Sequence, residues 1–227
     1  MVADIRTAIV TGGSRGLGLA LVRTLVEAGW RVVTDARDAS ALGAAVDELG
    51  PDVVAVPGDV TAPEHRAALI AAAGDRIHLV VNNAGGLGPS PLPALADYPL
   101  DELVDLFTVN VIAPLGVIQA ALPRLADGAV IVDITSDASV EAYPGWGGYG
   151  LTKAALDHLG RVLAVERPDV RVLTIDPGDM RTQMHQDAFP GEDISDRPPA
   201  EASVPAIVAL ISGDRPSGRY RAAEAAA

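Results

Sequence analysis

The amino-acid sequence predicts an α/β fold in which a parallel sheet is covered by helices on both faces. Short apolar, β-branched runs alternate with segments of helical apolar periodicity along the 227 residues, which is typical of such a sheet. A Gly-rich turn joins the first apolar run to the first helical segment. Apolar residues make up 49% of the chain, enough for one sizeable core. We therefore expect one domain over 1–221 and a disordered Ala-rich tail over 222–227.

Composition argues against several classes of partner. The net charge of −13 disfavours nucleic acid and anionic membranes. The chain has no cysteine, and its four histidines lack metal-ligand spacing, so no metal site is expected. No apolar stretch approaches about 18 residues, and the N-terminus does not read as a signal peptide. We expect a soluble, cytoplasmic protein.

The first strand and helix flank a candidate phosphate-binding turn. The apolar run Thr7–Thr11 leads into T-G-G-S-R-G-L-G, which ends at Gly18, and helical periodicity follows from Leu17. Glycines open the turn and let the backbone approach a ligand closely. The helix N-terminus after it offers free N–H groups to a pyrophosphate. An ordinary strand-to-helix turn is the alternative.

The end of the second strand, 31–34, bears on the choice of cofactor. In a doubly wound fold this strand tip meets the adenosine ribose, where an acid binds a free 2′-hydroxyl and an arginine a 2′-phosphate. Both types occur here, as Asp35 and Arg37, and Arg15 in the glycine turn could add a second cation. We favour NADP(H) over NAD(H), although surface charge alone would also explain Asp35 and Arg37.

The next elements place small polar residues after two further strands. A helix over 39–49 precedes a strand over 53–56, and Asp59 then either bonds an adenine amino group or caps the helix over 63–73. After the strand 77–81, the small residues of Asn82–Gly86 would let cofactor and backbone pass closely. A polar turn is the alternative.

A long helix is expected over 100–125, after the irregular, Pro- and Gly-rich segment 86–99. We expect it to be interrupted near Pro114 and ended by Asp127-Gly128. Asn110 lies inside it among apolar residues, where its amide needs partners. Its role is either catalytic or structural.

The fifth strand, 129–135, delivers Ser136, and the helix over 149–166 carries Tyr149 and Lys153. Spacing of i and i+4 puts the phenol and the ammonium on one helix face. An ammonium beside a phenol lowers the phenol's pKa and suits it to acid/base chemistry. Lys153 is the only lysine, against sixteen arginines, as if an ammonium were needed there. A solvated helix face is the alternative.

The last part of the chain contributes a sixth strand, 170–175, and a helix over about 201–212. Between them, Met180, Met184, His185 and Phe189 belong to a segment, 179–200, that either lines a pocket beyond the strands or forms a surface flap.

These motifs, in this order, resemble the short-chain dehydrogenase/reductase family over nearly the whole chain. The glycine motif T-G-x-x-x-G-x-G is followed by N-N-A-G at 82–85, an active-site asparagine, a serine, Y-x-x-x-K, and a P-G motif with a threonine after it. The matching residues are Thr11, Gly12, Gly16, Gly18, Asn110, Ser136, Tyr149, Lys153, Pro177, Gly178 and Thr182.

The resemblance implies a Rossmann-like sheet of strand order 3-2-1-4-5-6 and hydride transfer between nicotinamide and a small carbonyl or alcohol. Tyr149 would be the acid/base and Lys153 would bind the ribose. Ser136 would orient the carbonyl, Asn110 would hold a water, and Thr182 would contact the carboxamide. The cofactor-binding set would be Thr11, Gly12, Ser14, Arg15, Gly16, Leu17, Gly18, Arg37, Asp59, Val60, Asn83, Ala84, Gly85, Tyr149, Lys153, Pro177, Gly178, Met180 and Thr182.

The closing segment departs from the family. After the last helix come Ser217-Gly218-Arg219-Tyr220 and alanines, without the usual closing strand and glycine pair. A seventh strand, and the tetramer it often builds, are therefore left open. A homodimer through the helices 100–125 and 149–166 is expected.

Two other functions remain open. A catalytically idle NADP-binding redox sensor would share the cofactor half, but it has no need of Asn110, Ser136, Tyr149 and Lys153 together. A short epimerase or dehydratase would use a similar Tyr–Lys pair, but such enzymes resemble longer chains with a C-terminal substrate domain.

Overall fold

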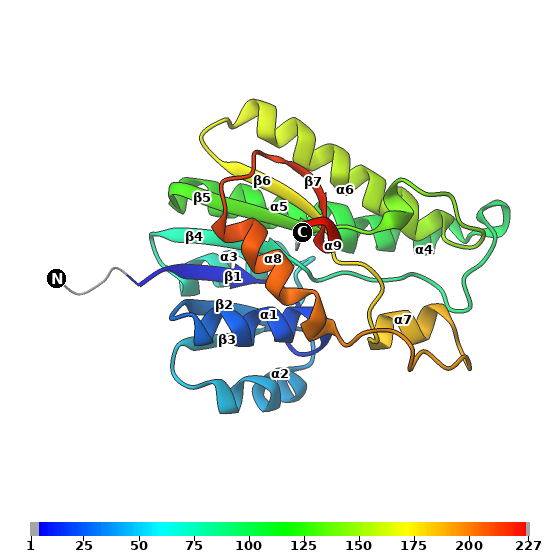
Figure 1. Ribbon diagram of the computed structural model, residues 1–227, viewed down its shortest axis with the longest axis horizontal. Coiled ribbons are helices and arrows are strands. Elements are labelled where there is room, and N and C mark those ends of the chain that lie inside the picture. The colour runs from blue at the N-terminus through cyan, green and yellow to red at the C-terminus, as the bar shows by residue number, and fades with distance from the viewer. Residues whose placement is uncertain (1–4, 226–227) are drawn as a thin grey trace.

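The computed structural model describes residues 5–225, in which one parallel sheet of seven strands is packed between helices (Figure 1). The order is β3-β2-β1-β4-β5-β6-β7, so the predicted order 3-2-1-4-5-6 is confirmed and extended by one strand. The strands are β1 (Thr7–Val10), β2 (Arg31–Ala36), β3 (Val53–Pro57), β4 (Ile77–Asn82), β5 (Leu125–Ile134), β6 (Arg171–Asp176) and β7 (Gly218–Arg221).

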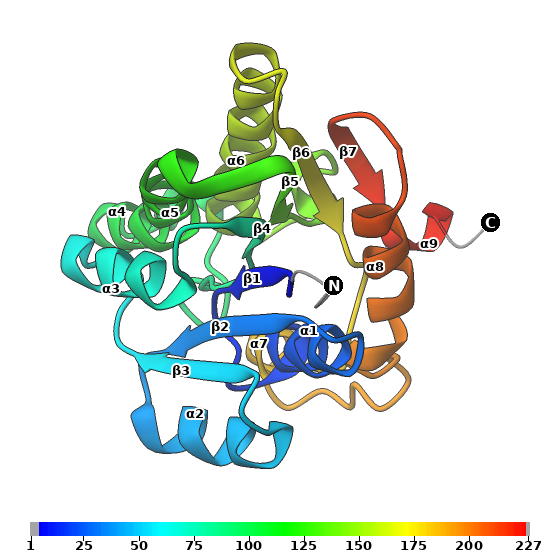
Figure 2. The same cartoon turned by 90° about the vertical axis from the view of Figure 1, so that its left-hand side faces the viewer.

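Each face of the sheet has its own apolar core, because successive strand residues point to opposite faces. In β1, Ala8 and Val10 pack on one face and Ile9 on the other, all fully buried. Figure 2 shows the two helical layers on either side of the strands. The first contains α1 (Gly16–Glu27) and α8 (Val204–Ser212), and the second contains α3 (Pro63–Ala73), α4 (Leu100–Phe107), α5 (Ala113–Ala121) and α6 (Gly147–Glu166).

The topology fixes where a ligand can bind. The chain moves outward from β1 to β3, then returns to β4 on the other side of β1 and continues to β7. All strands are parallel, so their carboxyl ends share one edge, and the crevice forms where the order reverses, between β1 and β4. The glycine turn after β1 and residues 82–86 after β4 meet there.

The predicted helix 100–125 is three pieces rather than one. A π-helical turn, Thr108–Ile112, separates α4 from α5, so the break comes before Pro114 rather than at it. Pro114 lacks the N–H that would continue the α-helical ladder across this turn. The helix ends at Ala121, and β5 already begins at Leu125, which pairs with Ile77.

A seventh strand, left open by the sequence, is present. Gly218–Arg221 pairs in parallel with β6, with Leu173 opposite Gly218 and Asp176 opposite Arg221. Its sequence, Gly-Arg-Tyr-Arg, has no apolar run, so its strand conformation comes from edge pairing rather than from burial. The expected disordered tail also begins as a helix, α9 (Ala222–Ala225), with Ala222 buried; residues 226–227 lie outside the described residues.

Two shorter helices complete the described fold, α2 (Ala39–Val46) and α7 (Gln183–Ala188). Contrary to the expectation from sequence, Leu100–Arg124 is long and apolar enough to cross a membrane. Its most apolar window has a mean hydropathy of 1.7, and 33% of that window is buried. An apolar helix packed on a sheet passes the same test, and Val117 and Ile118 of α5 are fully buried against the sheet.

Candidate active site

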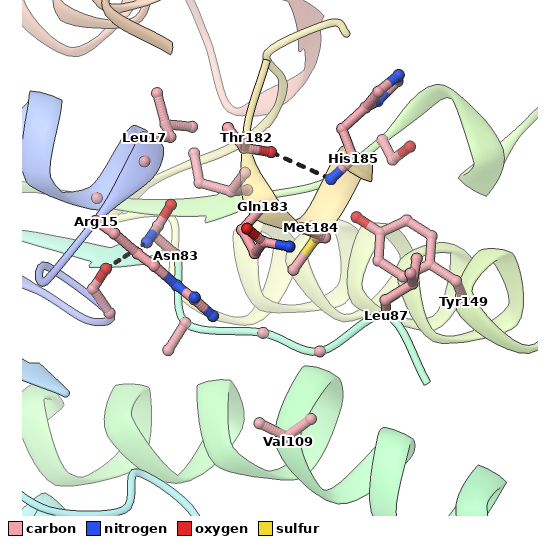
Figure 3. A pocket seen from close by; sticks show the side chains of 18 of the residues that line it. Arg15, Leu17, Asn83, Leu87, Val109, Tyr149, Thr182, Gln183, Met184 and His185 are labelled. Atoms are coloured by element: carbon pink, nitrogen blue, oxygen red, sulfur yellow. Dashed lines mark hydrogen bonds between the residues drawn. The ribbon is translucent and has the colours of Figure 1, made fainter. Parts of the chain in front are cut away.

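A cleft of about 1220 Å³ lies along the carboxyl edge of the sheet. Figure 3 shows Arg15 and Asn83 toward one end and Tyr149 and His185 toward the other. All the predicted catalytic and cofactor-binding residues line this cleft except Thr11 and Asn110. Segments from both ends of the chain therefore meet here, as the sequence predicted.

The glycine turn has the geometry of a phosphate cradle. Gly12 and Gly16 have φ of +74° and +55°, a region that favours glycine. A Cβ at Gly18 would collide with the carbonyl oxygen of Gly12. Arg15, the residue before α1, provides no side-chain cap, and the first turn of α1 contains no acid. The N–H groups of this helix end therefore face the cleft, ready for an anion.

Thr11 supports the cradle from behind rather than lining it. Its buried Oγ1 accepts hydrogen bonds from the backbone N–H groups of Asn83, at 3.1 Å, and Ala84, at 3.0 Å. Asn83 Nδ2 in turn donates to the Thr11 carbonyl at 2.9 Å. These bonds join the ends of β1 and β4. Thr11 is not among the residues that line the cleft, and its direct contact with the cofactor stays a prediction.

Asp35 has a supporting contact that the sequence did not reveal. Its Oδ1 accepts a hydrogen bond from the Gly12 N–H at 2.7 Å, and its Oδ2 lies 2.9 Å from His65 Nε2. Both side chains are buried, and burial raises the pKa of the Asp35 carboxyl above its ordinary value. With both oxygens engaged, Asp35 anchors the glycine turn, and it also lines the cleft.

The two arginines of this end remain at the surface of the cleft. Arg15 and Arg37 are exposed and line it. Asp59 accepts hydrogen bonds from the backbone N–H and hydroxyl of Thr61, each at 2.8 Å. These bonds hold the pKa of Asp59 below its ordinary value, with Arg37 adding to the effect. Asp59 therefore forms a turn with Thr61 and does not cap α3, whose N-cap is Ala62 without a side-chain hydrogen bond. Asp59 also lines the cleft.

Both the oxygen and the nitrogen of the Asn110 side-chain amide have hydrogen-bond partners. It lies in the π-helical turn, buried, and its Oδ1 accepts from the Gly86 N–H at 2.8 Å. Its Nδ2 donates to the Gly86 carbonyl at 2.9 Å and to Thr152 Oγ1 at 3.0 Å. The side chain thus ties the loop after β4 to α6, as the structural alternative requires, and the catalytic role of Asn110 stays a prediction.

Ser136, Tyr149 and Lys153 meet at the other end of the cleft. Ser136 lies two residues after the end of β5, and its Oγ accepts from the Ala138 N–H at 3.2 Å and donates to Asp137 Oδ1 at 3.0 Å. Tyr149 and Lys153 are buried one turn apart on α6. Lys153 Nζ donates to the Ile134 carbonyl at 2.8 Å and lies 5.5 Å from the centroid of the Tyr149 ring.

The expected lowering of the Tyr149 pKa by Lys153 is not what the structure shows. Burial raises the pKa of Tyr149 well above its ordinary value of 10, the Asp176 and Asp137 carboxylates raise it further, and a hydrogen bond with Ser136 opposes them. The Lys153 ammonium points at a backbone carbonyl, so it does not offset these effects. Without cofactor, Tyr149 is therefore protonated, in the form needed to donate a proton.

A buried polar cluster, missed by the sequence analysis, lies behind these residues. It consists of Asp133, Asp157, Asp176, Lys153 and Arg219. Burial lowers the pKa of Lys153 to about 8, while Asp133 and then Asp157 oppose that effect. Burial likewise raises the pKa of Asp133 to about 6, with Lys153 among the opposing influences.

Arg219 joins β7 to this cluster. Its Nε donates to Asp157 Oδ2 at 3.1 Å, and its Nη2 donates to the Ser136 carbonyl at 3.0 Å and to Asp176 Oδ2 at 3.3 Å. The strand that the sequence left open therefore positions the turn that carries Ser136.

The segment after β6 forms part of the wall of the cleft. Thr182 caps α7 by accepting from the His185 N–H at 3.3 Å, as drawn in Figure 3. It also faces the start of α1, because a Cβ at Gly16 would lie 3.6 Å from Thr182 Cγ2. Pro177, Gly178 and Met180 line the same stretch. The predicted pocket residues Met184, His185 and Phe189 also line the cleft rather than forming a detached flap.

The sequence matches the model of a known protein family. Residues 6–193 match the family described as short chain dehydrogenase. The chain belongs to the short-chain dehydrogenase/reductase family. It is therefore a member of a family of oxidoreductases, and its seven-stranded sheet has the Rossmann-like architecture of its structural neighbours.

Individual relatives of this short-chain dehydrogenase differ in their named activities. The 1-deoxy-11-beta-hydroxypentalenate dehydrogenase of Streptomyces avermitilis is 38% identical, covering 78% of this chain and 70% of that protein. A benzil reductase ((S)-benzoin forming) of Saccharomyces cerevisiae is 33% identical, covering 79% and 73%. A short chain dehydrogenase structure from Escherichia coli, complexed with NADPH, has a TM-score of 0.87 at 29% identity and covers 96% of each chain.

The cleft of this short-chain dehydrogenase fits a nicotinamide dinucleotide. An uncapped helix N-terminus and a glycine cradle suit a pyrophosphate, and two exposed arginines stand on the same side. The buried Lys153 and Tyr149 lie at the opposite end, where a nicotinamide would reach. The residues that would hold the cofactor are those already named along the cleft.

Proposed function

We propose that this protein is an NADPH-dependent reductase that interconverts a small carbonyl compound and its alcohol. The observation that carries the proposal is the meeting of Ser136, Tyr149 and Lys153 on the wall of a cleft whose other end is a phosphate cradle. Relatives named as reductases and a neighbour complexed with NADPH support the same class of reaction.

Each residue of the site has a role in that chemistry. The cofactor supplies or accepts the hydride when bound. Tyr149, protonated, donates its phenolic proton to the substrate oxygen, which gains charge as the carbonyl is reduced. The Ser136 hydroxyl orients and stabilises the same oxygen. The Lys153 ammonium lies 5.5 Å from the centroid of the Tyr149 ring and would bind the ribose. Asn110 fixes the loop after β4.

We propose NADP(H) rather than NAD(H) as the cofactor. Arg15 and Arg37 line the cleft and can make charge-assisted bonds to a 2′-phosphate, while Asp35 is occupied with Gly12 and His65. Arg37→Ala should weaken NADPH binding by about tenfold or more and leave NADH binding nearly unchanged. Titration of both cofactors against both proteins tests this, and tighter NADH binding by the unmodified protein would contradict it.

Turnover decides between this proposal and its alternatives. The purified protein should oxidise NADPH in the presence of carbonyl compounds, with one alcohol formed per NADPH consumed. An idle redox sensor would bind NADPH without consuming it. An epimerase or dehydratase would convert its substrate without net oxidation of NADPH. The direct measurement is NADPH absorbance together with quantified alcohol product.

We further propose a homodimer through α4 and α6. These helices carry exposed apolar side chains, with Leu100, Val104 and Val165 exposed at 76%, 64% and 81%. Such a surface is costly in a monomer and suits a partner helix pair. Light scattering should give twice the chain mass of 23.3 kDa, and Val165→Glu should shift it toward the monomer. A monomeric unmodified protein would contradict the dimer, and a tetramer would indicate a second interface.

A further inference from the structure

Aromatic side chains are scarce in this chain, and they gather around the proposed catalytic phenol. The 227 residues include only two Phe, two Trp and four Tyr. Half of these eight line the cleft, namely Tyr143, Trp146, Tyr149 and Phe189. The Trp146 ring meets the Tyr149 ring edge-on with centroids 5.7 Å apart, and its centroid lies 6.0 Å from that of Phe189. A continuous aromatic wall therefore extends from the catalytic group.

Three separate segments build this wall, so its shape is defined by tertiary contacts. The loop after β4 contributes Leu87, the turn before α6 contributes Trp146, and the end of α7 contributes Phe189. His185 of α7 stacks on Phe189 with centroids 5.0 Å apart. Ser90 Oγ donates to the Asp187 carbonyl at 2.6 Å and so fastens the loop after β4 to α7. The part of the cleft beside this wall, which we call the aromatic chamber, can hold a flat apolar group next to the phenol.

Two carboxylates that line the cleft, those of Asp137 and Asp176, act on the phenol. Asp137 and Asp176 both raise the pKa of Tyr149, and Tyr143 donates its hydroxyl to Asp137 Oδ2 at 3.0 Å. Arg181, an exposed cation on the cleft rim, donates to the Ser195 carbonyl at 3.4 Å. A carboxylate or phosphate on the substrate would therefore meet repulsion near the reacting oxygen, in a chain whose net charge is −13.

We propose that the substrate is an uncharged carbonyl compound that carries an aromatic ring on or next to its carbonyl carbon. This inference rests on the proposed reductase function. Tyr149 and Ser136 bind the carbonyl oxygen, and the ring lies against Trp146 and Phe189. Ring contacts with these side chains select aryl over alkyl carbonyls, and the carboxylates of Asp137 and Asp176 select against anionic ones.

Three matched aldehydes test the two parts of the proposal. Benzaldehyde, cyclohexanecarbaldehyde and 4-formylbenzoate differ by aromaticity and by one carboxylate. With saturating NADPH, kcat/KM for benzaldehyde should exceed that for cyclohexanecarbaldehyde by about tenfold, the scale of one or two aromatic contacts. It should exceed that for 4-formylbenzoate by at least as much. Equal or reversed ratios in either pair would overturn the corresponding part.

Substitutions then locate the selectivity. Trp146→Leu and Phe189→Leu should each lower the ratio of benzaldehyde to cyclohexanecarbaldehyde kcat/KM several-fold. The ratio is the readout because Trp146 contacts Tyr149, and any effect on the phenol cancels between the two substrates. Phe107→Leu is the matched control, since Phe107 is the only other phenylalanine and does not line the cleft. A ratio unchanged in both cleft variants would overturn the assignment of the wall.

A binding measurement separates failure of this inference from failure of the proposed function. If no aldehyde is reduced, the reductase assignment fails, but calorimetry with the protein and NADP can still compare benzyl alcohol with cyclohexylmethanol. Tighter binding of benzyl alcohol would support the aromatic chamber independently of turnover. Equal or weaker binding would reject it.

Discussion

The two ends of the cleft handle buried charge in different ways. At the glycine-turn end the buried carboxylate of Asp35 has both oxygens engaged, one by the Gly12 N–H and one by His65. At the Tyr149 end, three buried acids surround Lys153 and Arg219. There Asp133 Oδ2 and Asp157 Oδ1 have no hydrogen-bond partner among residues 5–225. We call the first the saturated end, because both oxygens of its buried carboxylate have partners. We call the second the unsettled end, because two of its buried carboxylate oxygens have none among the described residues.

That difference separates the end of the cleft that would bind the phosphates of the cofactor from the end that would carry out catalysis. A saturated network holds the backbone in one conformation, which is what a phosphate cradle requires. Unsettled buried charges instead shift proton affinities, and such shifts are typical of catalytic groups. The large displacements of pKa, those of Tyr149, Lys153 and Asp133, all lie at the same end, whereas the pKa of Asp35 at the other end is raised less. The following predictions, from the largest expected effect to the smallest, test this division.

Tyr149→Phe should break the Tyr149 end while leaving the other end intact. It deletes only the phenolic hydroxyl, so turnover of a carbonyl substrate should fall by about 10²-fold or more, while NADPH affinity is retained. Single-turnover rates and NADPH titration give the two quantities. Tyr98→Phe is the control, because Tyr98 is buried and does not line the cleft. A Tyr149→Phe protein with near-normal turnover would contradict the acid/base role.

Arg219→Gln should show how strongly the Tyr149 end depends on its cation. Asp157 and Asp176 would lose a partly buried guanidinium, which should cost about 3 kcal/mol of unfolding free energy, or roughly 10 °C in the unfolding midpoint. Thermal and urea unfolding measure this directly.

Arg221→Gln provides the matched control for that substitution. Arg221 lies on the same strand and approaches Asp176 at 3.6 Å, but its side chain is 42% exposed. Its loss should cost less than about 1 kcal/mol. Equal losses in the two variants would show that Arg219 contributes no more than a surface arginine.

Asp35→Ala should break the saturated end. Without the carboxylate that holds the Gly12 N–H, the glycine turn should bind NADPH about tenfold more weakly, the scale of one charge-assisted hydrogen bond. Turnover at saturating NADPH should change little. Asp52→Ala, at an exposed site before β3, removes the same charge elsewhere and controls for net charge. Tighter NADPH binding by Asp35→Ala would mean that charge repulsion outweighs the anchoring contact.

The smallest expected effect at the unsettled end is a shift in the pH dependence of kcat/KM, which follows the pKa of Lys153. Burial lowers the pKa of Lys153 to about 8, so kcat/KM for the carbonyl substrate should fall as pH rises through that value and the ammonium is lost. The Asp133 carboxylate favours the ammonium and holds this pKa up. Asp133→Asn should therefore move the basic limb to lower pH, by less than about one unit. A limb that stays in place would exclude Asp133 as an influence on Lys153.

The sequence by itself determined the features that depend on local pattern. The alternation of strands and helices, the glycine turn and the i, i+4 pair of Tyr149 and Lys153 are all set by residues close in the chain. A positive φ favours glycine wherever it occurs in a fold. A spacing of four residues places a phenol and an ammonium one turn apart in any helix. The resemblance of these motifs to a known family then implied the strand order, and nearly all the predicted site residues line the cleft.

Only the tertiary structure decided the contacts between distant segments. Asp35 reaches His65 across 30 positions, and Arg219 reaches the Ser136 carbonyl across 83, so no local pattern announces either. Strand β7 has no apolar run and exists because β6 offers it a free edge. The pKa of Tyr149 rises rather than falls because burial and two carboxylates act on the phenol while Lys153 faces a carbonyl. Proton affinity depends on the whole surroundings of a group in space, and those surroundings are set only when the chain is folded.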